Sequence, residues 1–311
     1  MCKPLVAIAI ATYNHEKFIA QAIESVLNQK TSFPFCAYIG DDASTDKNQE
    51  ICKYYAAKFP DKIKLLLRTK NNFKENSKAI YAACFNSGAK YVAMLDGDDY
   101  WSDENKLQEQ IDILEKNENT VLCYHNIGIH DERLIKIPFN IFNPPIQNAT
   151  TVDIINTHFV PTHSIVFRNI IDFSKHFNVM EKLISGDIYI ELVLSLHGTF
   201  YHLDKEMAVY RLQDTSFTSP IRHDFSWVKS RLFLYKSFND ISKGKFEKAL
   251  AKKMIDLLKL ELKYILMHET GDVKKNRLKQ NRKNAFEFLP FLNALSYYFQ
   301  TLTFKPEDHP V

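Results

Sequence analysis

The residues best suited to chemistry are the carboxylates of Asp96, Asp98, Asp99 and Asp103, which directly follow a short apolar segment. So many carboxylates in one turn repel one another unless a cation or solvent neutralises them. Magnesium and manganese prefer such hard oxygen ligands, and water and substrate phosphates complete their coordination shell. The turn therefore predicts a divalent metal site. An exposed acidic turn that only leads into the next helix remains the alternative.

Two more polar clusters follow apolar segments in the same way. Asp41 and Asp42 come after the second such segment, and their carboxylates are suited to accept hydrogen bonds from a base N–H group or from ribose hydroxyls. Thr12 and Asn14 follow the first segment, and Gly97 leaves the acidic turn without a side chain where a diphosphate must approach. Ordinary turn and helix-cap roles remain open for these residues.

Short apolar runs alternate with helical patterns over the first 126 residues, which is typical of strand–helix–strand units and a largely parallel sheet. The expected strands are 5–12, 35–40, 63–67, 91–95, 121–125, 164–167, 199–203 and 207–210. A helix is expected over 18–27, and Ser44 or Thr45 is expected to cap the helix that follows the second strand. Because parallel sheets bind ligands at the carboxyl ends of their strands, the three polar clusters are predicted to meet at one edge.

The remainder of the chain is less regular. Proline residues interrupt 127–160, which predicts a connecting excursion on the acceptor side. A change of composition predicts a boundary after residue 219, giving a catalytic domain of 1–219 and a helical C-terminal extension of 220–311. Basic residues at 274–283 precede an aromatic stretch at 286–304, and either peripheral contact with an anionic membrane or a solvated helix face explains them.

Composition restricts the class of protein. The 311 residues carry 40 basic and 37 acidic side chains, a net charge of +3 that gives no field strong enough for a nucleic-acid partner. The five cysteines have no C-x-x-C spacing, so a disulfide framework and a zinc site are not expected, and a reducing cytosol fits best. The apolar run at 5–11 is too short for a signal peptide and predicts a buried strand. The expected location is cytoplasmic, with the inner face of the membrane as the peripheral alternative.

Four ordered motifs carry a family resemblance: ATYNH at 11–15, AIESVLNQ at 22–29, DDASTD at 41–46 and DGDDYW at 96–101. Together they resemble the family-2 glycosyltransferases of bacterial surface-polysaccharide pathways over roughly residues 4 to 215. The resemblance implies an α/β fold of the GT-A type, with helices on both faces of a Rossmann-like sheet. It also implies inverting transfer from a nucleotide-diphosphate sugar, with a UDP-sugar favoured, to a glycan or lipid-linked glycan of lipopolysaccharide or capsule.

The resemblance also implies roles for individual residues. It assigns the nucleotide-sugar to Thr12, Asn14, Asp41, Asp42, Asp96 and Arg211. It assigns Mn²⁺ or Mg²⁺ to Asp98, with Asp96 as the other member of the Asp-x-Asp pair and Asp99 as a competitor. A histidine often stands two residues after the arginine in this family, but here the position is Gln213, which puts the strength of metal binding in question.

Inverting transfer needs one base to take the proton of the acceptor hydroxyl as that hydroxyl attacks. The segment that begins at Gly186 and Asp187 resembles the family segment that supplies this base, so Asp187 is the predicted catalytic residue and Glu191 the reserve. From spacing alone, Asp187 is equally a residue that caps the helix it begins.

Two other functions stay open on the sequence. A nucleotidyltransferase uses the same type of crevice and metal, although this chain has no Gly-rich, lysine-bearing phosphate loop near its N-terminus. A non-catalytic scaffold that binds a nucleotide or glycan is the second alternative, and Gln213 is the residue that favours it.

Overall fold

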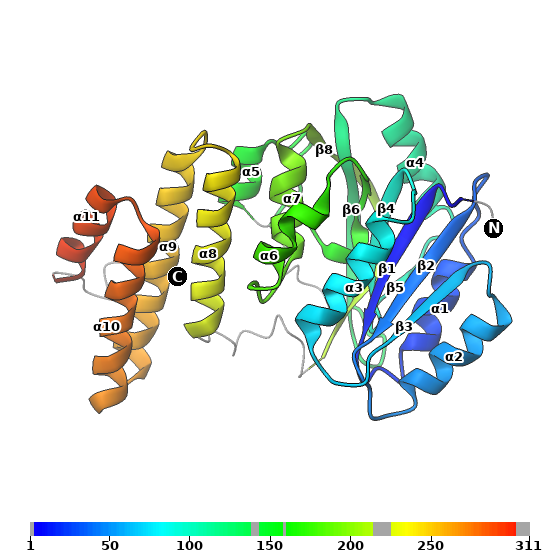
Figure 1. Ribbon diagram of the computed structural model, residues 1–311, viewed down its shortest axis with the longest axis horizontal. Helices are drawn as coiled ribbons and strands as arrows, with labels where there is room; N and C mark the ends of the chain where they lie inside the picture. Colours follow the sequence, from blue (N-terminus) through cyan, green and yellow to red (C-terminus); the bar gives the residue numbers. More distant parts are fainter. Residues whose placement is uncertain (1–2, 138–142, 158–159, 214–224, 303–311) are drawn as a thin grey trace. The chain divides into compact units, whose positions relative to one another are not determined.

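The computed structural model describes residues 3–137, 143–157, 160–213 and 225–302 (Figure 1). The chain divides into two compact units, one made of Met1–Glu181 with Ile190–Ser216 and the other of Lys182–Tyr189 with Phe217–Val311. The predicted domain boundary after residue 219 lies outside the described residues and stays a prediction. Asp187 belongs to the second unit, together with the C-terminal helices.

A mixed sheet forms the first unit, with strand order β3-β2-β1-β4-β7-β6-β8-β5 in the described residues. The strands are β1 (Val6–Thr12), β2 (Phe35–Asp41), β3 (Ile63–Leu67), β4 (Tyr91–Asp96), β5 (Tyr100–Trp101), β6 (Thr120–Asp131), β7 (Val166–Arg168) and β8 (Thr199–Leu212). β1 pairs in parallel with both β2 and β4, and β2 pairs in parallel with β3. The predicted parallel arrangement of these four strands is confirmed.

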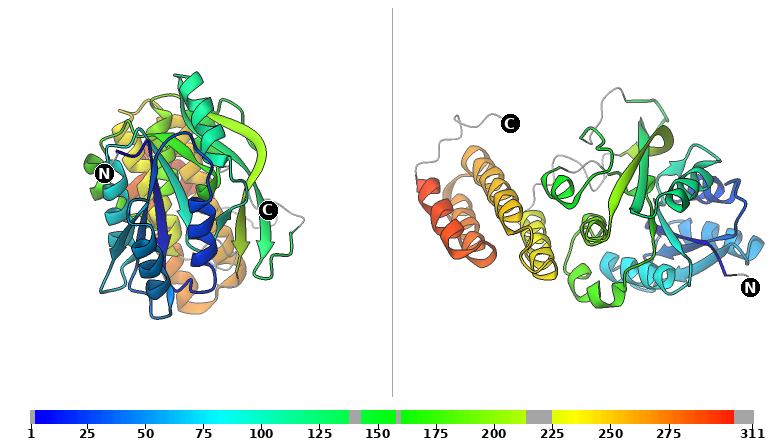
Figure 2. Two further views of the ribbon diagram at one scale, coloured as in Figure 1. Left: turned by 90° about the vertical axis from the view of Figure 1, so that its right-hand side faces the viewer. Right: turned by 90° about the horizontal axis from the view of Figure 1, so that it is seen from above.

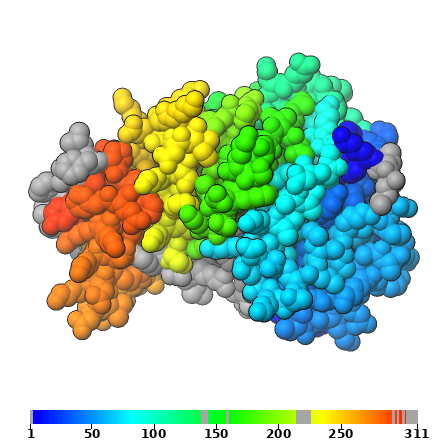
Figure 3. Space-filling model, viewed as in Figure 1, coloured from blue at the N-terminus to red at the C-terminus, as the bar shows by residue number. Residues whose placement is uncertain are grey.

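Helices cover both faces of this sheet. Ile8 and Ile10 of β1 pack in one core with Ile23 of α1 and Ile111 of α4, whereas α3 contacts β1 and β2 and lies apart from α1 and α2 (Figures 1 and 2). The segment that contains α3, coloured cyan, forms a large part of the surface in Figure 3. Because β1 is buried on both faces, its sequence is a nearly continuous apolar run, as expected for a central parallel strand.

The helices of the described residues occupy both units. Those of the sheet unit and its edge are α1 (Ile19–Leu27), α2 (Asn48–Lys58), α3 (Phe73–Phe85), α4 (Lys106–Lys116), α5 (Thr151–Asn156), α6 (Phe177–Met180) and α7 (Asp187–Ser195), with short 3-10 helices η1 (Thr162–Ser164) and η2 (Phe173–His176). Those that follow are α8 (Phe225–Ile241), α9 (Glu247–His268), α10 (Gly271–Phe288) and α11 (Phe291–Leu302). The predicted helix at 18–27 and the helical C-terminal region are therefore confirmed.

Several predicted segments have different bounds in the structure. β6 continues to Asp131, six residues beyond the predicted end of that strand, because it pairs with β8 along its length with register shifts near His125 and Asn126. β8 is one strand from Thr199 to Leu212, where two were predicted, since the exposed residues between the two apolar runs remain in the same strand. The predicted excursion also contains the helix α5.

The second unit is built from helices that contact their neighbours along the chain (Figure 2). Buried polar groups help to join α9, α10 and α11: Asn281 donates to the Glu261 carboxylate over 2.8 Å, and Tyr297 donates to Asn281 over 2.7 Å. Among the described residues, none of the helices is both long and apolar enough to cross a bilayer.

Candidate active site

The register of the central strands brings the three polar clusters to one edge of the sheet. Thr12 at the end of β1 lies opposite Asp41 at the end of β2, and Ala11 lies opposite Asp96 at the end of β4. The sequence prediction that these clusters meet is therefore confirmed for the strand ends that carry them. We call this region the carboxyl edge.

Gly97 allows the two loops of the carboxyl edge to approach closely. Its amide donates to the Ala11 carbonyl over 2.8 Å, and a Cβ atom added at Gly97 would lie only 2.5 Å from Oγ1 of Thr12. The absence of a side chain is thus required by contact between the loop after β4 and the end of β1, whatever ligand the edge holds.

Asp98, in the acidic turn, has a partly accessible carboxylate, with 21% of its side chain exposed. Its Oδ2 accepts a hydrogen bond of 2.9 Å from Nε2 of Gln213 and lies 3.9 Å from Nε2 of His15. Gln213 therefore reaches the residue that the sequence favours for the metal. The contact joins two segments 115 residues apart in the chain.

Asp99, its neighbour, has a different environment. The carboxylate is 1% exposed, accepts a 2.8 Å hydrogen bond from the backbone amide of Arg211, and lies 3.2 Å from Nδ1 of His163. Burial raises the pKa of Asp99 well above its ordinary value, and the charges of Asp98 and Asp96 raise it further. Burial also lowers the pKa of His163 to about 3, so both shifts favour an uncharged pair.

Arg211 is enclosed by the protein and is only 2% exposed. Its guanidinium donates to the backbone carbonyl of Asp98 and to the side chain of Gln21. It also lies over two aromatic rings, 4.8 Å from the centroid of Phe18 and 4.9 Å from that of Tyr100. These contacts tie Arg211 to the acidic turn and leave little of its surface accessible to a ligand.

Asp41 is fully buried and accepts hydrogen bonds from three donors of its own loop and helix. The amide of Ser44 donates to it over 3.0 Å, and the side chains of Asn48 and Gln49 each donate over 2.7 Å. Thr12, 3% exposed, donates from its hydroxyl to Oδ1 of Asn48 over 3.0 Å. Asn48 therefore links the ends of β1 and β2.

Asn14 adopts the left-handed backbone region, with φ of 55°, which asparagine tolerates better than most residues. The backbone amide of Asn14 donates to Oγ of Ser44 over 2.9 Å, and its side-chain Oδ1 accepts from the backbone amide of Thr45 over 2.8 Å. The expectation that Ser44 or Thr45 caps the next helix is wrong. That helix begins at Asn48, and the two residues instead join the loop after β2 to the loop after β1.

Asp42 is 2% exposed and connects β2 to the entry of α3. Its Oδ1 accepts from the amide of Asn72 over 2.8 Å and lies 3.9 Å from Nε of Arg68. The amide of Asp42 donates to the Thr12 carbonyl over 3.0 Å. Thr12, Asn14, Asp41 and Asp42 thus belong to one hydrogen-bonded network at the carboxyl edge.

Asp187 begins α7 in the second unit, as the sequence predicted, and is partly buried. Its Oδ1 accepts from the hydroxyl of Ser185 and, over 2.9 Å, from the amide of Ile188. Glu191, one turn further along the helix, is only 1% exposed. Of the two candidate bases, Asp187 is thus the more accessible to an acceptor.

Sequence reasoning missed a buried polar cluster behind the acidic turn. Lys106 is fully buried, donates to Gln110 over 2.7 Å and lies 4.1 Å from the ring centroid of Trp101. Gln110 in turn donates to the carbonyls of Cys123 and Ser164, each over 2.9 Å. Burial lowers the pKa of Lys106 to about 7. In the sequence, Lys106 stands beside apolar residues of an amphipathic helix, and that pattern does not predict a buried lysine.

No three His, Cys, Asp or Glu side chains gather closely enough to hold a metal alone within the described ranges. The donor set nevertheless fits a hard cation held by one or two carboxylates, since Asp98 is partly exposed and the amide of Gln213 lies beside it.

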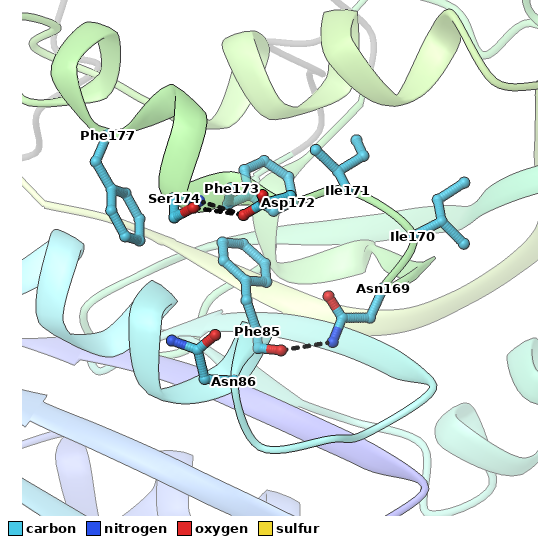
Figure 4. Close-up of a pocket in the computed structure, with 9 residues that line it drawn as sticks. All are labelled: Phe85, Asn86, Asn169, Ile170, Ile171, Asp172, Phe173, Ser174 and Phe177. Carbon is cyan, nitrogen blue, oxygen red and sulfur yellow. Dashed lines mark hydrogen bonds between the residues drawn. The ribbon is translucent and has the colours of Figure 1, made fainter.

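The described residues also form a cavity of about 260 Å³ at the opposite edge of the sheet (Figure 4). Asn169, which follows β7, donates to the carbonyl of Phe85, and the rings of Phe85 and Phe173 stack 3.9 Å apart. Asp172 accepts from the amide of Ser174 over 3.2 Å. Near the carboxyl edge, a cavity lined by Asp96 and Thr162 measures only about 20 Å³. Size alone therefore favours the opposite edge, whereas charge favours the carboxyl edge.

Comparison with known families gives a match over most of the sheet unit. The sequence model described as Glycosyl transferase family 2 matches residues 7–173. An uncharacterised protein of Mycobacterium tuberculosis is 30% identical over 210 residues, which are 66% of this chain and 58% of the relative. The putative teichuronic acid biosynthesis glycosyltransferase TuaG of Bacillus subtilis is 34% identical over 116 residues, covering 36% of this chain and 42% of the relative. The chain thus spans about half the length of these curated relatives.

Solved structures share the fold at low identity. Staphylococcus aureus TarS in complex with UDP-GlcNAc aligns with a TM-score of 0.62 at 17% identity, covering 90% of this chain and 81% of that chain. The mannosyltransferase PcManGT of Pyrobaculum calidifontis, in complex with GDP-Man and Mn²⁺, aligns with a TM-score of 0.52 at 10% identity, covering 97% of this chain and 88% of that chain.

Proposed function

Because this chain belongs to glycosyl transferase family 2 and has the GT-A fold, we propose that it moves a sugar from a nucleotide-diphosphate sugar to a glycan or lipid-linked glycan, with inversion at the anomeric carbon. A UDP-sugar is the favoured donor, and surface polysaccharide synthesis is the favoured pathway. The observation that carries the proposal is the meeting of Thr12, Asp41 and the acidic turn at one edge of the sheet.

The names of four similar proteins bear on the finer parts of the proposal. TarS is described with UDP and with UDP-GlcNAc, and PcManGT with GDP-Man. TuaG is named for teichuronic acid biosynthesis and EpsE of Bacillus subtilis is named a putative glycosyltransferase. TarS, which aligns with the higher TM-score of the two structures, motivates the choice of UDP over GDP, and TuaG motivates the choice of a cell-surface glycan as acceptor.

We assign the nucleoside end of the donor to the two loops held together by Thr12, Asn14 and Asp42. Asp41 already accepts three hydrogen bonds and is fully buried, so its role there is to hold the loop in shape. Donors and acceptors fixed in this way bind a ligand without further loss of conformational freedom.

Mn²⁺ or Mg²⁺, when bound, stabilises the charge that develops on the departing diphosphate. Asp98 is the proposed ligand because its carboxylate is partly exposed, and Asp96 is the second. Asp99 is the weaker candidate, since its carboxylate is already occupied by the Arg211 amide and by His163. Arg211 is proposed to stabilise the acidic turn through its bond to the Asp98 carbonyl, and not to bind a phosphate directly.

Asp187 is the proposed base for the acceptor hydroxyl. Two donors at the start of α7 orient its carboxylate, and the residue is partly exposed. A general base of this kind contributes about 10²- to 10⁴-fold in rate. Glu191 is the proposed alternative only if Asp187 proves dispensable, because Glu191 is almost fully buried.

Peripheral contact with an anionic membrane through 274–304 is a further part of the proposal. Phe286 is 46% exposed on α10, the helix that also carries the basic residues of 274–283. Flotation with vesicles that contain phosphatidylglycerol tests it, with neutral vesicles as the control. A protein that stays unbound to both kinds of vesicle at low salt contradicts this part alone.

The decisive experiment is a donor screen that follows release of nucleoside diphosphate from a panel of nucleotide-sugars, with Mn²⁺ or Mg²⁺ and with EDTA. We expect metal-dependent release from one donor, strongly reduced in both Asp98→Asn and Asp187→Asn. Glu191→Gln is the matched control for the base, and Asp172→Asn, at the opposite edge of the sheet, is the control for the metal ligand.

Each other outcome changes the proposal in a defined way. Release that EDTA does not affect removes the metal and keeps the transferase. Pyrophosphate released from a nucleoside triphosphate indicates a nucleotidyltransferase. Nucleotide binding without turnover of any donor indicates a binding scaffold.

A further inference from the structure

His163 is the first residue in a series of contacts that ends at Asp98 in the acidic turn. It belongs to η1, between α5 and β7, and its side chain is 2% exposed. Nδ1 of the ring lies 3.2 Å from Oδ2 of Asp99, and the ring stacks on Tyr210 at an angle of 15° with centroids 5.6 Å apart. The backbone carbonyl of His163 also accepts from Nε1 of Trp101 over 2.9 Å.

The second oxygen of Asp99 extends this contact to the end of β8. Oδ1 accepts from the amide of Arg211 over 2.8 Å, and Arg211 donates to the backbone carbonyl of Asp98. Two residues further on, Gln213 donates to the carboxylate of Asp98 over 2.9 Å. The buried Asp99 carboxylate thus connects His163 to the backbone of Arg211, and Gln213, which donates to Asp98, follows Arg211 by two residues at the same strand end.

We propose that His163 is a positioning residue for sugar transfer: through Asp99 it fixes the end of β8, and that strand end fixes Asp98. His163 touches no substrate in this arrangement. The inference rests on the proposed function for Asp98, because only that function makes the position of the Asp98 carboxylate matter for turnover. Removing a residue that helps to orient a metal ligand typically changes activity about 10- to 100-fold.

His125 provides a matched control within the same unit. It is 1% exposed, and, as in His163, its buried Nε2 has no hydrogen-bond partner among the residues that the structure describes. Its Nδ1 lies 2.7 Å from the carbonyl of Asn126, so its contact is to β6 and not to the acidic turn. Phenylalanine in place of either histidine removes buried ring nitrogens, but of the two histidines His163 is the one that lies beside Asp99.

The experiment compares His163→Phe, His163→Asn and His125→Phe. Phenylalanine keeps the ring and its stacking on Tyr210 but loses the nitrogen, whereas asparagine can place its amide nitrogen near the position of Nδ1. Hydrogen–deuterium exchange of peptides containing Arg211 reports the strand end directly. Turnover of the donor found in the screen gives kcat and KM separately.

We expect His163→Phe to raise exchange at Arg211 about tenfold or more, because the Asp99 carboxylate loses the partner that orients it. In the same variant kcat should fall about 10- to 100-fold with a smaller change in KM. His163→Asn should recover most of both quantities. His125→Phe should lower the Tm yet leave both quantities at the wild-type level.

Equal effects of His163→Phe and His125→Phe on exchange and kcat overturn the proposal, because they indicate a general packing role. Normal exchange at Arg211 in folded His163→Phe also overturns it, as does failure of His163→Asn to recover. If His163→Phe does not fold, His163→Gln, whose amide is displaced by one bond, takes its place with the same expectations. Absence of donor turnover in the wild type contradicts the proposed function, whereas the exchange measurement still tests the contact.

Discussion

The two edges of the sheet differ in what they offer a ligand. The edge opposite the carboxyl edge, which we call the amino-terminal edge, has the larger of the two cavities described, about 260 Å³. Stacked aromatic rings and polar groups that bond to nearby residues line this cavity. The carboxyl edge has a cavity of only about 20 Å³, yet three loops converge there with a partly exposed carboxylate. Cavity volume alone thus favours the amino-terminal edge, whereas charge and strand direction favour the carboxyl edge.

Phe173→Ala tests whether the amino-terminal edge is structural. Phe173 is 1% exposed and stacks on Phe85, so its removal leaves a cavity and should lower the free energy of unfolding by about 3–5 kcal/mol. Urea unfolding measures this loss. Activity per folded molecule should stay at the wild-type level, and a fall in kcat larger than the folded fraction explains would assign chemistry to this edge.

Asp98→Asn tests whether the carboxyl edge carries the reaction. The amide oxygen of the replacement can still accept from Gln213, so stability should change by less than about 0.5 kcal/mol, as for most exposed substitutions. The lost charge should reduce kcat about 10²- to 10³-fold. Steady-state kinetics with the donor from the screen measures this effect.

The control for Asp98→Asn is Asp172→Asn, which removes a carboxylate at the amino-terminal edge and should leave kcat unchanged. Equal rates for the two variants would contradict the assignment of the metal to Asp98. Together with Phe173→Ala, the pair separates an edge that stabilises the fold from one that carries the reaction.

Lys106→Met tests the buried cluster behind the carboxyl edge through its pH dependence. Burial lowers the pKa of Lys106 from its ordinary value of 10.5 to about 7, so between these values the unfolded chain holds a proton that the folded chain has released. Stability from this group therefore rises with pH above about 7, by at most about 1.4 kcal/mol per pH unit. Below pH 7 the group contributes no slope.

The measurement is urea unfolding of the wild type and Lys106→Met at pH 6, 7, 8 and 9. The difference in stability between the two proteins should grow in favour of the wild type as pH rises above 7. A difference that stays constant with pH would mean that the lysine keeps its charge, held by Gln110 and the face of Trp101.

The fold of the first unit was predictable because its signals are local. Apolar runs such as 5–12 and 91–95 end in polar turns, and parallel pairing then brings those turns to one edge. The length of β6 and the continuity of β8 were not predictable, because the polar residues of one strand remain extended only through pairing with the other.

Within the site, the types of residue were predictable, but which of them are buried and which are accessible was not. Asp98 and Asp99 are adjacent in sequence, and only the strand end at Arg211 and the distant His163 bury one carboxylate and leave the other partly exposed. Ser44 and Thr45 have the side chains of helix caps, yet bonds to Asn14 occupy both. Contacts between segments far apart in the chain decided each case.

Ile170→Ser has the smallest expected effect and is the sharpest test of the difference between the two edges. Ile170 lines the larger cavity and is 50% exposed, so the substitution should change stability by no more than about 0.5 kcal/mol. If the cavity has no part in the reaction, kcat and the KM for the acceptor also stay unchanged, as steady-state kinetics can measure. A rise in acceptor KM with unchanged donor KM would instead mean that the glycan reaches across the sheet unit to this edge, and the cavity would then be an acceptor subsite in place of a packing defect.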